Sequence, residues 1–313
     1  MSGTLTLSNS FLEVTIRIPD RSNEGCRFDN ACAVEQVVLN GRHMFCQPEQ
    51  VHPENRSSGG AGLISEFVWD QVACETSPGK PFPKLGVGLL TQVSRGGAFN
   101  KWNPYKIQRF ERHWHRHTSG ISFVEEPLLC EGYAARIHKD LTLYANTITV
   151  TTTIENVGEK RLDLLEYQHN FVAIDGLPAG PGHKLWIPCD SQLAELEYAF
   201  HDRAAADRTQ QAVPAAQVLG EMAVWTRSME GKTFFKVTPG TALRPSAPYM
   251  WKLSHTQSDA SVMEISHFAP EKLVLWGTEH CICAEVFAGI HVEHGQVQTF
   301  SRTWIFEDDT TKG

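Results

Sequence analysis

The sequence predicts an all-β protein, a large antiparallel β-sandwich formed by one domain over residues 1–313. Residues 146–158 alternate β-branched and other side chains and end at an Asn-x-Gly turn, the pattern of a strand. Residues 133–144 read as a second strand, and only Ala145 and Asn146 separate the two, so we expect a hairpin. No internal repeat or low-complexity linker marks a boundary, and all-β domains of this size are common. Two all-β domains are the alternative arrangement.

The other strands follow from the same signals in chain order. The Asn40-Gly41 pair between apolar runs is typical of a tight hairpin turn. Residues 164–176 open like a buried strand. We also expect strands at residues 4–9, 11–18, 33–46, 120–126, 232–238, 261–268, 281–287 and 297–306.

Two segments depart from this pattern. Residues 48–105 are polar and rich in glycine and proline, which predicts irregular backbone over a sheet; long loops of this kind are often functional. Residues 204–222 are rich in alanine and glutamine and interrupted by Pro214, so we expect a loop with a short helix at most.

Composition limits the classes of partner. The chain carries 28 Lys and Arg against 36 Asp and Glu, a net charge of −8, which disfavours nucleic acid and anionic membranes. The N-terminal segment has no apolar core of a signal peptide, and no run approaches the roughly 20 apolar residues of a membrane helix. We therefore expect a cytoplasmic protein whose eight cysteines are reduced and mostly buried. The oligomeric state, monomer or dimer, stays open.

The polar run Gln168-His169-Asn170 interrupts an apolar strand. Consecutive residues of a strand point to opposite faces, so polar groups occupy both faces at the same height. A buried polar group without a partner costs about 1–3 kcal/mol, which favours a wet concave site over a dry core. A core histidine bonded to backbone groups is the alternative.

Glu285 is the second candidate, because it lies inside the apolar strand CICAEVF. Such a carboxylate is paired, desolvated with a raised pKa, or directed into a cavity. It shares a face with Cys281 and Cys283. A general base is placed in the same way, whereas a salt bridge is the structural alternative.

These features together resemble the aldose 1-epimerase (galactose mutarotase-like) superfamily. The likeness rests on Gln168-His169-Asn170-Phe171, on Trp276 followed by Cys283-Ala284-Glu285, on Glu293-His294-Gly295 with the last strand, and on the strand at residues 146–158. The sequence departs from that pattern because it has no LHGG-like segment with a second histidine and no NRI-like arginine. A glycine-rich stretch with Glu66, and later Lys84, occupies that part of the chain.

The resemblance implies an enzyme that interconverts the anomers of a sugar by acid/base ring opening. Glu285 would take the proton of the anomeric hydroxyl, and a protonated His169 would protonate the ring oxygen; each such group contributes about 10²–10⁴-fold. No metal or redox cofactor is implied. The candidate substrate-binding residues are Gln168, Asn170, Asp175, Glu66, Lys84, Trp276 and His115. Asp175 has a second interpretation as the cap of its Asp-Gly turn, and Trp276 as core.

Other interpretations stay open. His113, His115 and His117 alternate on one face of a possible strand, which suits a metal site, the rim of a sugar cleft, or a plain surface. Lys84 is a candidate for binding an anionic group. The alternative functions are a carbohydrate-binding protein without catalysis, and a hydrolase or lyase of the same superfamily. Hydrolysis requires a second carboxylate facing Glu285, for which Glu66 is the candidate; elimination requires a cation such as Lys84 or Arg95.

Overall fold

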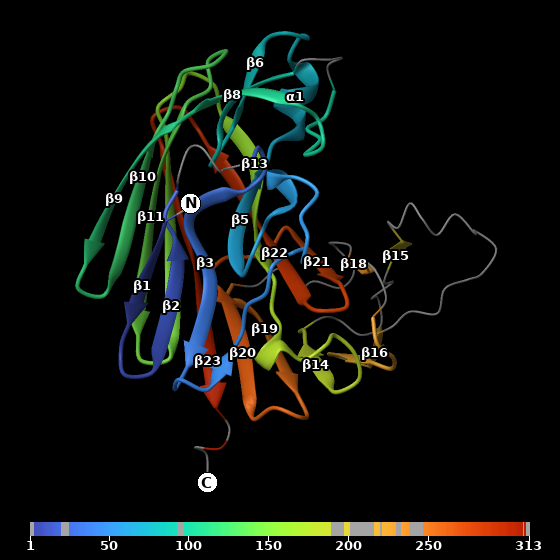
Figure 1. Cartoon of the computed structure of the whole chain (residues 1–313). Helices are drawn as coiled ribbons and strands as arrows, with labels where there is room; N and C mark the ends of the chain where they lie inside the picture. Colours follow the sequence, from blue (N-terminus) through green and yellow to red (C-terminus); the bar gives the residue numbers. More distant parts are fainter. Residues whose placement is uncertain are drawn as a thin grey trace, which may run out of the picture.

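The computed structural model consists almost entirely of β-strands, arranged in two large sheets that face each other (Figure 1). It describes residues 3–19, 25–92, 97–188, 197–200, 216–219, 221–229, 233–237, 247–308 and 310. The predicted antiparallel β-sandwich is confirmed in this part of the chain.

The first sheet has ten strands within the described residues. Nine of them follow the order β1-β2-β3-β5-β13-β22-β21-β18-β15, and β4 pairs with β3. Their bounds are β1 Thr4–Ser8, β2 Leu12–Arg17, β3 Asp29–Leu39, β4 His43–Met44, β5 Leu63–Val68, β13 Leu162–Asn170, β15 Glu197–Phe200, β18 Thr233–Val237, β21 Lys272–Gly277 and β22 Ile282–Val292.

The second sheet also has ten strands in the described part, in the order β16-β17-β14-β19-β20-β23-β12-β11-β10-β9. Their bounds are β9 Glu111–His117, β10 Gly120–Glu126, β11 Ala135–Tyr144, β12 Thr147–Asn156, β14 His183–Trp186, β16 Ala216–Leu219, β17 Met222–Trp225, β19 Tyr249–His255, β20 Ala260–Ser266 and β23 Val297–Asp308. Both sheets mix strands from the two halves of the chain, which favours the expected single domain.

A small third sheet and the short helix α1 (Asp70–Glu75) lie together at the top of Figure 1. The sheet consists of β6 (Pro81–Lys84), β7 (Gly88–Gln92) and β8 (Tyr105–Arg109). Apolar side chains of α1, β6 and β7 pack in one cluster with Leu164 of β13 and Ile290 of β22. This cap therefore sits beside the central strands of the first sheet.

The main core fills the space between the two sheets. Alternate residues of strands from both sheets point into it, and its largest fully buried members include Trp251, Trp304, Phe45 and Phe306. Because strand side chains alternate between faces, the remaining residues of β5, β13 and β22 point to the outer face of the first sheet, away from this core.

The expected hairpin is confirmed: β11 pairs with β12 from Ala135↔Asn156 to Tyr144↔Thr147, and Ala145 has φ of 48° in the turn. The Asn40-Gly41 turn likewise joins β3 to β4, with positive φ at both residues.

Two expectations about irregular segments are wrong in part. Residues 48–105 contain β5, α1, β6 and β7, and β5 is a central strand whose first five residues are all buried. Its pattern was concealed because Ser65 and Glu66 place polar groups on both faces. Residues 216–219 form the strand β16 and not a helix, while residues 204–215 lie outside the described residues.

The described cysteines are all free thiols, and all are buried apart from Cys74, as expected. None of the helices in the described residues has the length and apolar character needed to span a membrane.

Candidate active site

Three central strands of the first sheet place ionisable side chains on the outer face of that sheet. Glu66 of β5 lies directly opposite Tyr167 of β13 in the antiparallel ladder, so their side chains share a face. His169, two residues further along β13, points the same way. Glu285 of β22 completes the group, because its Oε1 lies 2.7 Å from Nδ1 of His169.

The ladder between β13 and β22 is interrupted at this point. Pairing runs from Leu162↔Val292 to Tyr167↔Phe287 and resumes in the same register at the isolated bridge Val172↔Ile282. His169 and Glu285 lie between these two positions. Their side-chain contact therefore spans a local opening in the sheet, where both groups are almost completely buried, at 2% and 6% exposure.

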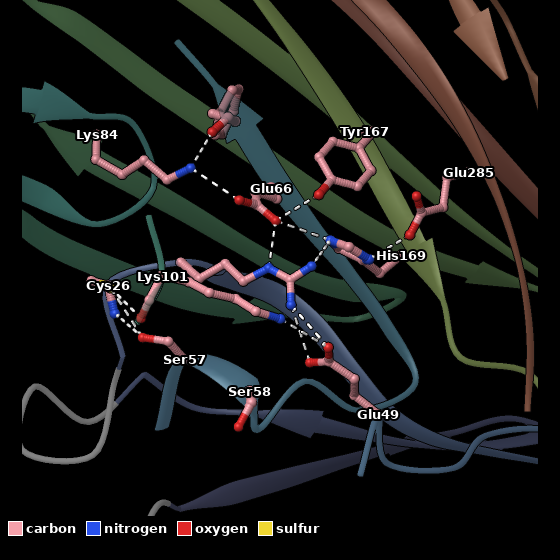
Figure 2. A network of polar contacts seen from close by, with 12 residues as sticks. Cys26, Glu49, Ser57, Ser58, Glu66, Lys84, Lys101, Tyr167, His169 and Glu285 are labelled. Carbon is pink, nitrogen blue, oxygen red and sulfur yellow. Dashed lines mark hydrogen bonds and ion pairs between the residues drawn. The ribbon is translucent and has the colours of Figure 1, made fainter. Parts of the chain in front are cut away.

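Glu66 is the hub of the network (Figure 2). Its Oε2 accepts hydrogen bonds from Arg27 Nε at 2.7 Å and Tyr167 Oη at 2.7 Å, and lies 3.1 Å from His169 Nε2. Lys84 Nζ lies 3.2 Å from the other oxygen. The imidazole is thus held between two carboxylates, Glu66 on one nitrogen and Glu285 on the other.

Three further charged residues join the network from irregular segments. Arg27 precedes β3, and its Nη1 donates to both oxygens of Glu49 at 3.0 and 3.2 Å. Lys101 Nζ lies 3.3 Å from Glu49 Oε1. Arg27 Nη2 also lies 3.4 Å from His169 Nε2. Sequence analysis did not single out these residues, although Glu49 and Lys101 belong to the segment expected to carry functional loops.

An open cavity of about 420 Å³ adjoins this network, within the size range of small-molecule sites. Its lining consists of Arg27, Glu66, Ala98, Phe99, Asn100, Lys101 and Tyr167. His169 and Glu285 are not part of the lining and lie beneath Glu66 and Tyr167. Tyr167 was within reach of sequence reasoning, because it sits two residues before His169 and so shares its face.

Burial and ion pairing together set the protonation states. Burial raises the pKa of Glu66, but Lys84 and Arg27 outweigh it and hold the pKa well below its ordinary value. Burial lowers the pKa of His169, but Glu285 outweighs it, so the net pKa is raised. Burial and the charge of Glu66 place the pKa of Tyr167 well above its ordinary value. The site therefore combines a carboxylate, a readily charged imidazole and a neutral phenol.

Comparisons with known proteins bear on the fold. Neither a protein-family model nor a curated protein matches this sequence. Solved structures do match. The Slr1438 protein of Synechocystis sp. PCC 6803 is 12% identical with a TM-score of 0.60, covering 98% of this chain and 96% of its own. A candidate aldose 1-epimerase of Escherichia coli K12 is 13% identical with a TM-score of 0.59, covering 98% and 99%. A galactose mutarotase related enzyme of Lactobacillus acidophilus is 10% identical with a TM-score of 0.57, covering 97% of each chain.

The chain has the galactose mutarotase-like fold. The resemblance inferred from the sequence is thereby confirmed at the level of structure. Identities of 10–13% carry the fold alone, so the reaction has to be argued from the site.

Aromatic rings flank the imidazole on the galactose mutarotase-like scaffold. His169 stacks on Phe171 at 5.3 Å between ring centroids, and Phe28 meets it edge-on at 5.2 Å. Trp276 contacts Phe171 at 5.6 Å and is 6% exposed, so it belongs to the packing behind the imidazole. The rings restrict the imidazole to the orientation in which its two nitrogens meet the two carboxylates.

Asn170 and Gln168 lie on the other face of β13, so the expectation that the whole run lines one wet site does not fit the structure. The amide of Asn170 donates to Glu264 at 2.8 Å and to the carbonyl of Ala284 at 2.7 Å, and accepts from Trp304 at 2.9 Å. Buried partners therefore satisfy this amide inside the sandwich. Gln168 is buried on the same side.

Asp175 and His115 lie elsewhere in the molecule. Asp175 has φ of 53° in the 3₁₀ turn Ile174–Gly176, and its carboxylate contacts His43 at 2.9 Å and Ser258 at 2.7 Å. His115 is exposed on β9, in the second sheet, away from the strands that carry His169. Neither residue joins the network of Glu66.

A metal ion has one conceivable set of ligands in the described residues: His169, Cys283 and Glu285, whose ligand atoms lie within 4.8 Å of one another. Burial and Glu285 raise the pKa of Cys283 well above its ordinary value. Its thiol lies 3.5 Å from Glu285 Oε1 and its sulfur accepts the amide N–H of Asn170 at 3.0 Å. Since metal ligands bind in deprotonated form, a protonated thiol and a charged imidazole disfavour a metal here.

Proposed function

We propose that this chain is an aldose 1-epimerase-like enzyme that interconverts the anomers of a sugar by acid/base ring opening. One observation carries the proposal: an imidazole held between two carboxylates lies directly beneath an open cavity that fits a small molecule. Neighbours that share the fold across nearly the whole chain are named for this reaction, which supports the choice.

We assign the base to Glu66, which differs from the assignment made from the sequence. Glu285 is engaged by Nδ1 of His169 and does not line the cavity, whereas Glu66 does. The lowered pKa keeps Glu66 ionised over the working pH range, so it can accept a proton, but it also makes this carboxylate a weaker base than one whose pKa lies near the working pH. Glu285 then acts as a positioning residue that keeps His169 oriented and charged.

The reaction requires two proton transfers at the hemiacetal. Glu66 takes the proton of the anomeric hydroxyl, His169 Nε2 gives its proton to the ring oxygen, and the C1–O5 bond breaks to give the aldehyde. For this transfer the ring oxygen replaces Glu66 Oε2 as the acceptor of the Nε2 proton, beside the 3.4 Å approach of Arg27. After the aldehyde rotates, the ring closes on the other face with the roles reversed: neutral His169 takes the proton of the C5 hydroxyl, and Glu66 gives its proton to the carbonyl oxygen, which restores the starting protonation of both groups.

Two alternatives have less support. A hydrolase needs room between its two carboxyl groups for a water or a glycosidic bond, but the imidazole of His169 fills the space between Glu66 and Glu285. Of the two cations considered for elimination, Lys84 is buried, binds Glu66 and the carbonyl of Phe67, and does not line the cavity, while Arg95 lies outside the described residues. Binding without catalysis is distinguished by experiment.

The test follows the optical rotation of freshly dissolved α-aldoses, neutral and anionic, with and without the protein. We expect acceleration that falls by about 10²–10⁴-fold in Glu66→Gln and His169→Asn. Glu13→Gln, an exposed carboxylate on β2, is the control and retains full activity. Binding without acceleration would instead identify a carbohydrate-binding protein, and acceleration that survives both site variants would refute the assignment.

A further inference from the structure

Two cations converge at one side of the cavity. Arg27 and Lys101 are both among the residues that line it. A single atom, Glu49 Oε1, lies 3.0 Å from Arg27 Nη1 and 3.3 Å from Lys101 Nζ. Because one oxygen reaches both groups, an anion with two or three oxygens is able to bridge them.

Lys101 keeps donors free for a ligand. An ammonium has three N–H donors, and Glu49 is its only ion-pair partner among the described residues. The side chain of Lys101 is 21% exposed while that of Glu49 is 4% exposed, so the carboxylate lies underneath and the ammonium faces the opening. Burial, and then the nearby charge of Arg27, lower the pKa of Lys101, and a bound anion would offset both effects.

The loop that carries Lys101 is held in place. Phe99 stacks on Tyr105 at 5.7 Å, and Lys84 Nζ lies 4.2 Å from the centroid of the Phe99 ring. The backbone N–H of Asn100 donates to the hydroxyl of Tyr105 at 3.0 Å. These contacts position the ammonium in advance, which reduces the entropy lost on binding.

The charges of the network do not balance. Arg27, Lys84 and Lys101 match the three carboxylates Glu49, Glu66 and Glu285, so a protonated His169 leaves an excess of one positive charge. This excess lies in a chain whose overall charge is −8. A positive charge that is buried away from water is stabilised by a nearby anion, and an anionic ligand would reach this network through the cavity.

We propose that the substrate is an anionic sugar, whose carboxylate or phosphate group binds Lys101 and Arg27 while its anomeric carbon lies at Glu66 and Tyr167. The inference rests on the proposed function of this site and names its substrate class. Free hexuronic acids and hexose phosphates share the required chemistry.

The test measures binding by isothermal titration calorimetry to a hexuronic acid, a hexose 6-phosphate, the matching neutral hexose and inorganic phosphate. We expect at least one anionic sugar to bind roughly tenfold or more tightly than the neutral hexose. The preference should shrink as salt is raised from 50 to 500 mM, because the attraction is screened. Whichever anionic sugar binds more tightly identifies the source of the charge.

Lys101→Gln is expected to reduce this preference by roughly tenfold, whereas Lys101→Arg retains most of it. Lys106→Gln, an exposed lysine on β8, is the matched control, and circular dichroism verifies that each variant is folded. Equal affinity for neutral and anionic hexoses, or an unchanged preference in Lys101→Gln, would overturn the inference.

The outcomes separate this inference from the proposed reaction. Accelerated anomer exchange of neutral hexoses without anionic preference upholds the reaction and refutes the anionic substrate. Tight, Lys101-dependent binding of a uronide whose cleavage raises the ultraviolet absorbance upholds the anionic site and refutes anomer exchange as the reaction.

Discussion

The neighbouring carboxylates of His169 raise its pKa against the effect of its burial. The imidazole is 2% exposed, which by itself lowers its pKa, yet Glu285 at 2.7 Å reverses the shift. We therefore expect Glu285→Gln to lower the pKa of His169, because burial remains while the opposing charge is lost. Titration of the imidazole signals by NMR measures this directly, with Glu13→Gln as the control.

The same substitution has a kinetic consequence at the residue level. His169 donates its proton as the acid, so activity is lost as pH rises through its pKa. In Glu285→Gln the alkaline limb of the pH–rate profile should therefore move to lower pH. An unchanged limb and an unchanged imidazole titration would show that Glu285 does not control the charge of His169.

Sequence reasoning singled out Glu285 and His169 separately, as polar residues inside apolar strands, and the resemblance to the aldose 1-epimerase superfamily implied that the two share one site. It did not find Arg27, Glu49 and Lys101, which lie in irregular segments without periodicity. Their partners are distant in the chain: Arg27 and His169 are 142 positions apart, and Lys101 and Glu49 are 52 apart. No local pattern encodes such contacts, whereas the two-residue period would have indicated Tyr167.

At the level of elements, the site depends on the opening between β13 and β22. Where backbone pairing stops, Asn170 replaces it: its side chain binds the carbonyl of Ala284, next to Glu285, and its N–H meets the sulfur of Cys283. The same amide binds Trp304 of β23 and Glu264 of β20, in the second sheet. Asn170 thus fixes the relative position of the two strands that carry His169 and Glu285.

We expect Asn170→Ala to reduce the free energy of unfolding by at least about 2 kcal/mol, since the Ala284 carbonyl and the Trp304 indole lose buried partners. Denaturant unfolding measures the change. Thr153→Ala, which removes the exposed hydroxyl pair with Thr299, is the control and should stay within about 0.5 kcal/mol. A loss below 1 kcal/mol in Asn170→Ala would mean that the strands hold their register without this amide.

The strands that sequence analysis found are those with a regular alternation, such as β11, β12 and β23. β5 was missed because burial of both faces and the pair Ser65 and Glu66 remove the alternation. Sheet order was beyond local signals: β13 lies between β5 and β22, strands roughly 100 residues away in either direction, and only the tertiary fold sets that order.

At the scale of the whole molecule, histidines with opposite shifts determine how stability depends on pH. His183 is 2% exposed and lies 4.4 Å from the ring of His255; burial, then the charge of His255, lower its pKa to about 4. The unfolded chain binds a proton at this position below about pH 6.5, so stability declines as pH falls from about 6.5 to 4. His169 acts oppositely: its raised pKa means that stability declines as pH rises above about 6.5.

The two trends predict a maximum of stability near pH 6.5, the ordinary pKa of histidine. His183→Asn should flatten the acid side, where the shift to about 4 corresponds to about 3 kcal/mol. Glu66, with its lowered pKa, adds a further loss only below about pH 4.5. Urea unfolding between pH 4 and 9 tests this, with the exposed His52→Asn as the control. A stability that rises steadily through pH 8 would show that His169 is not charged in the folded protein, and the acid of the proposed reaction would be lost with it.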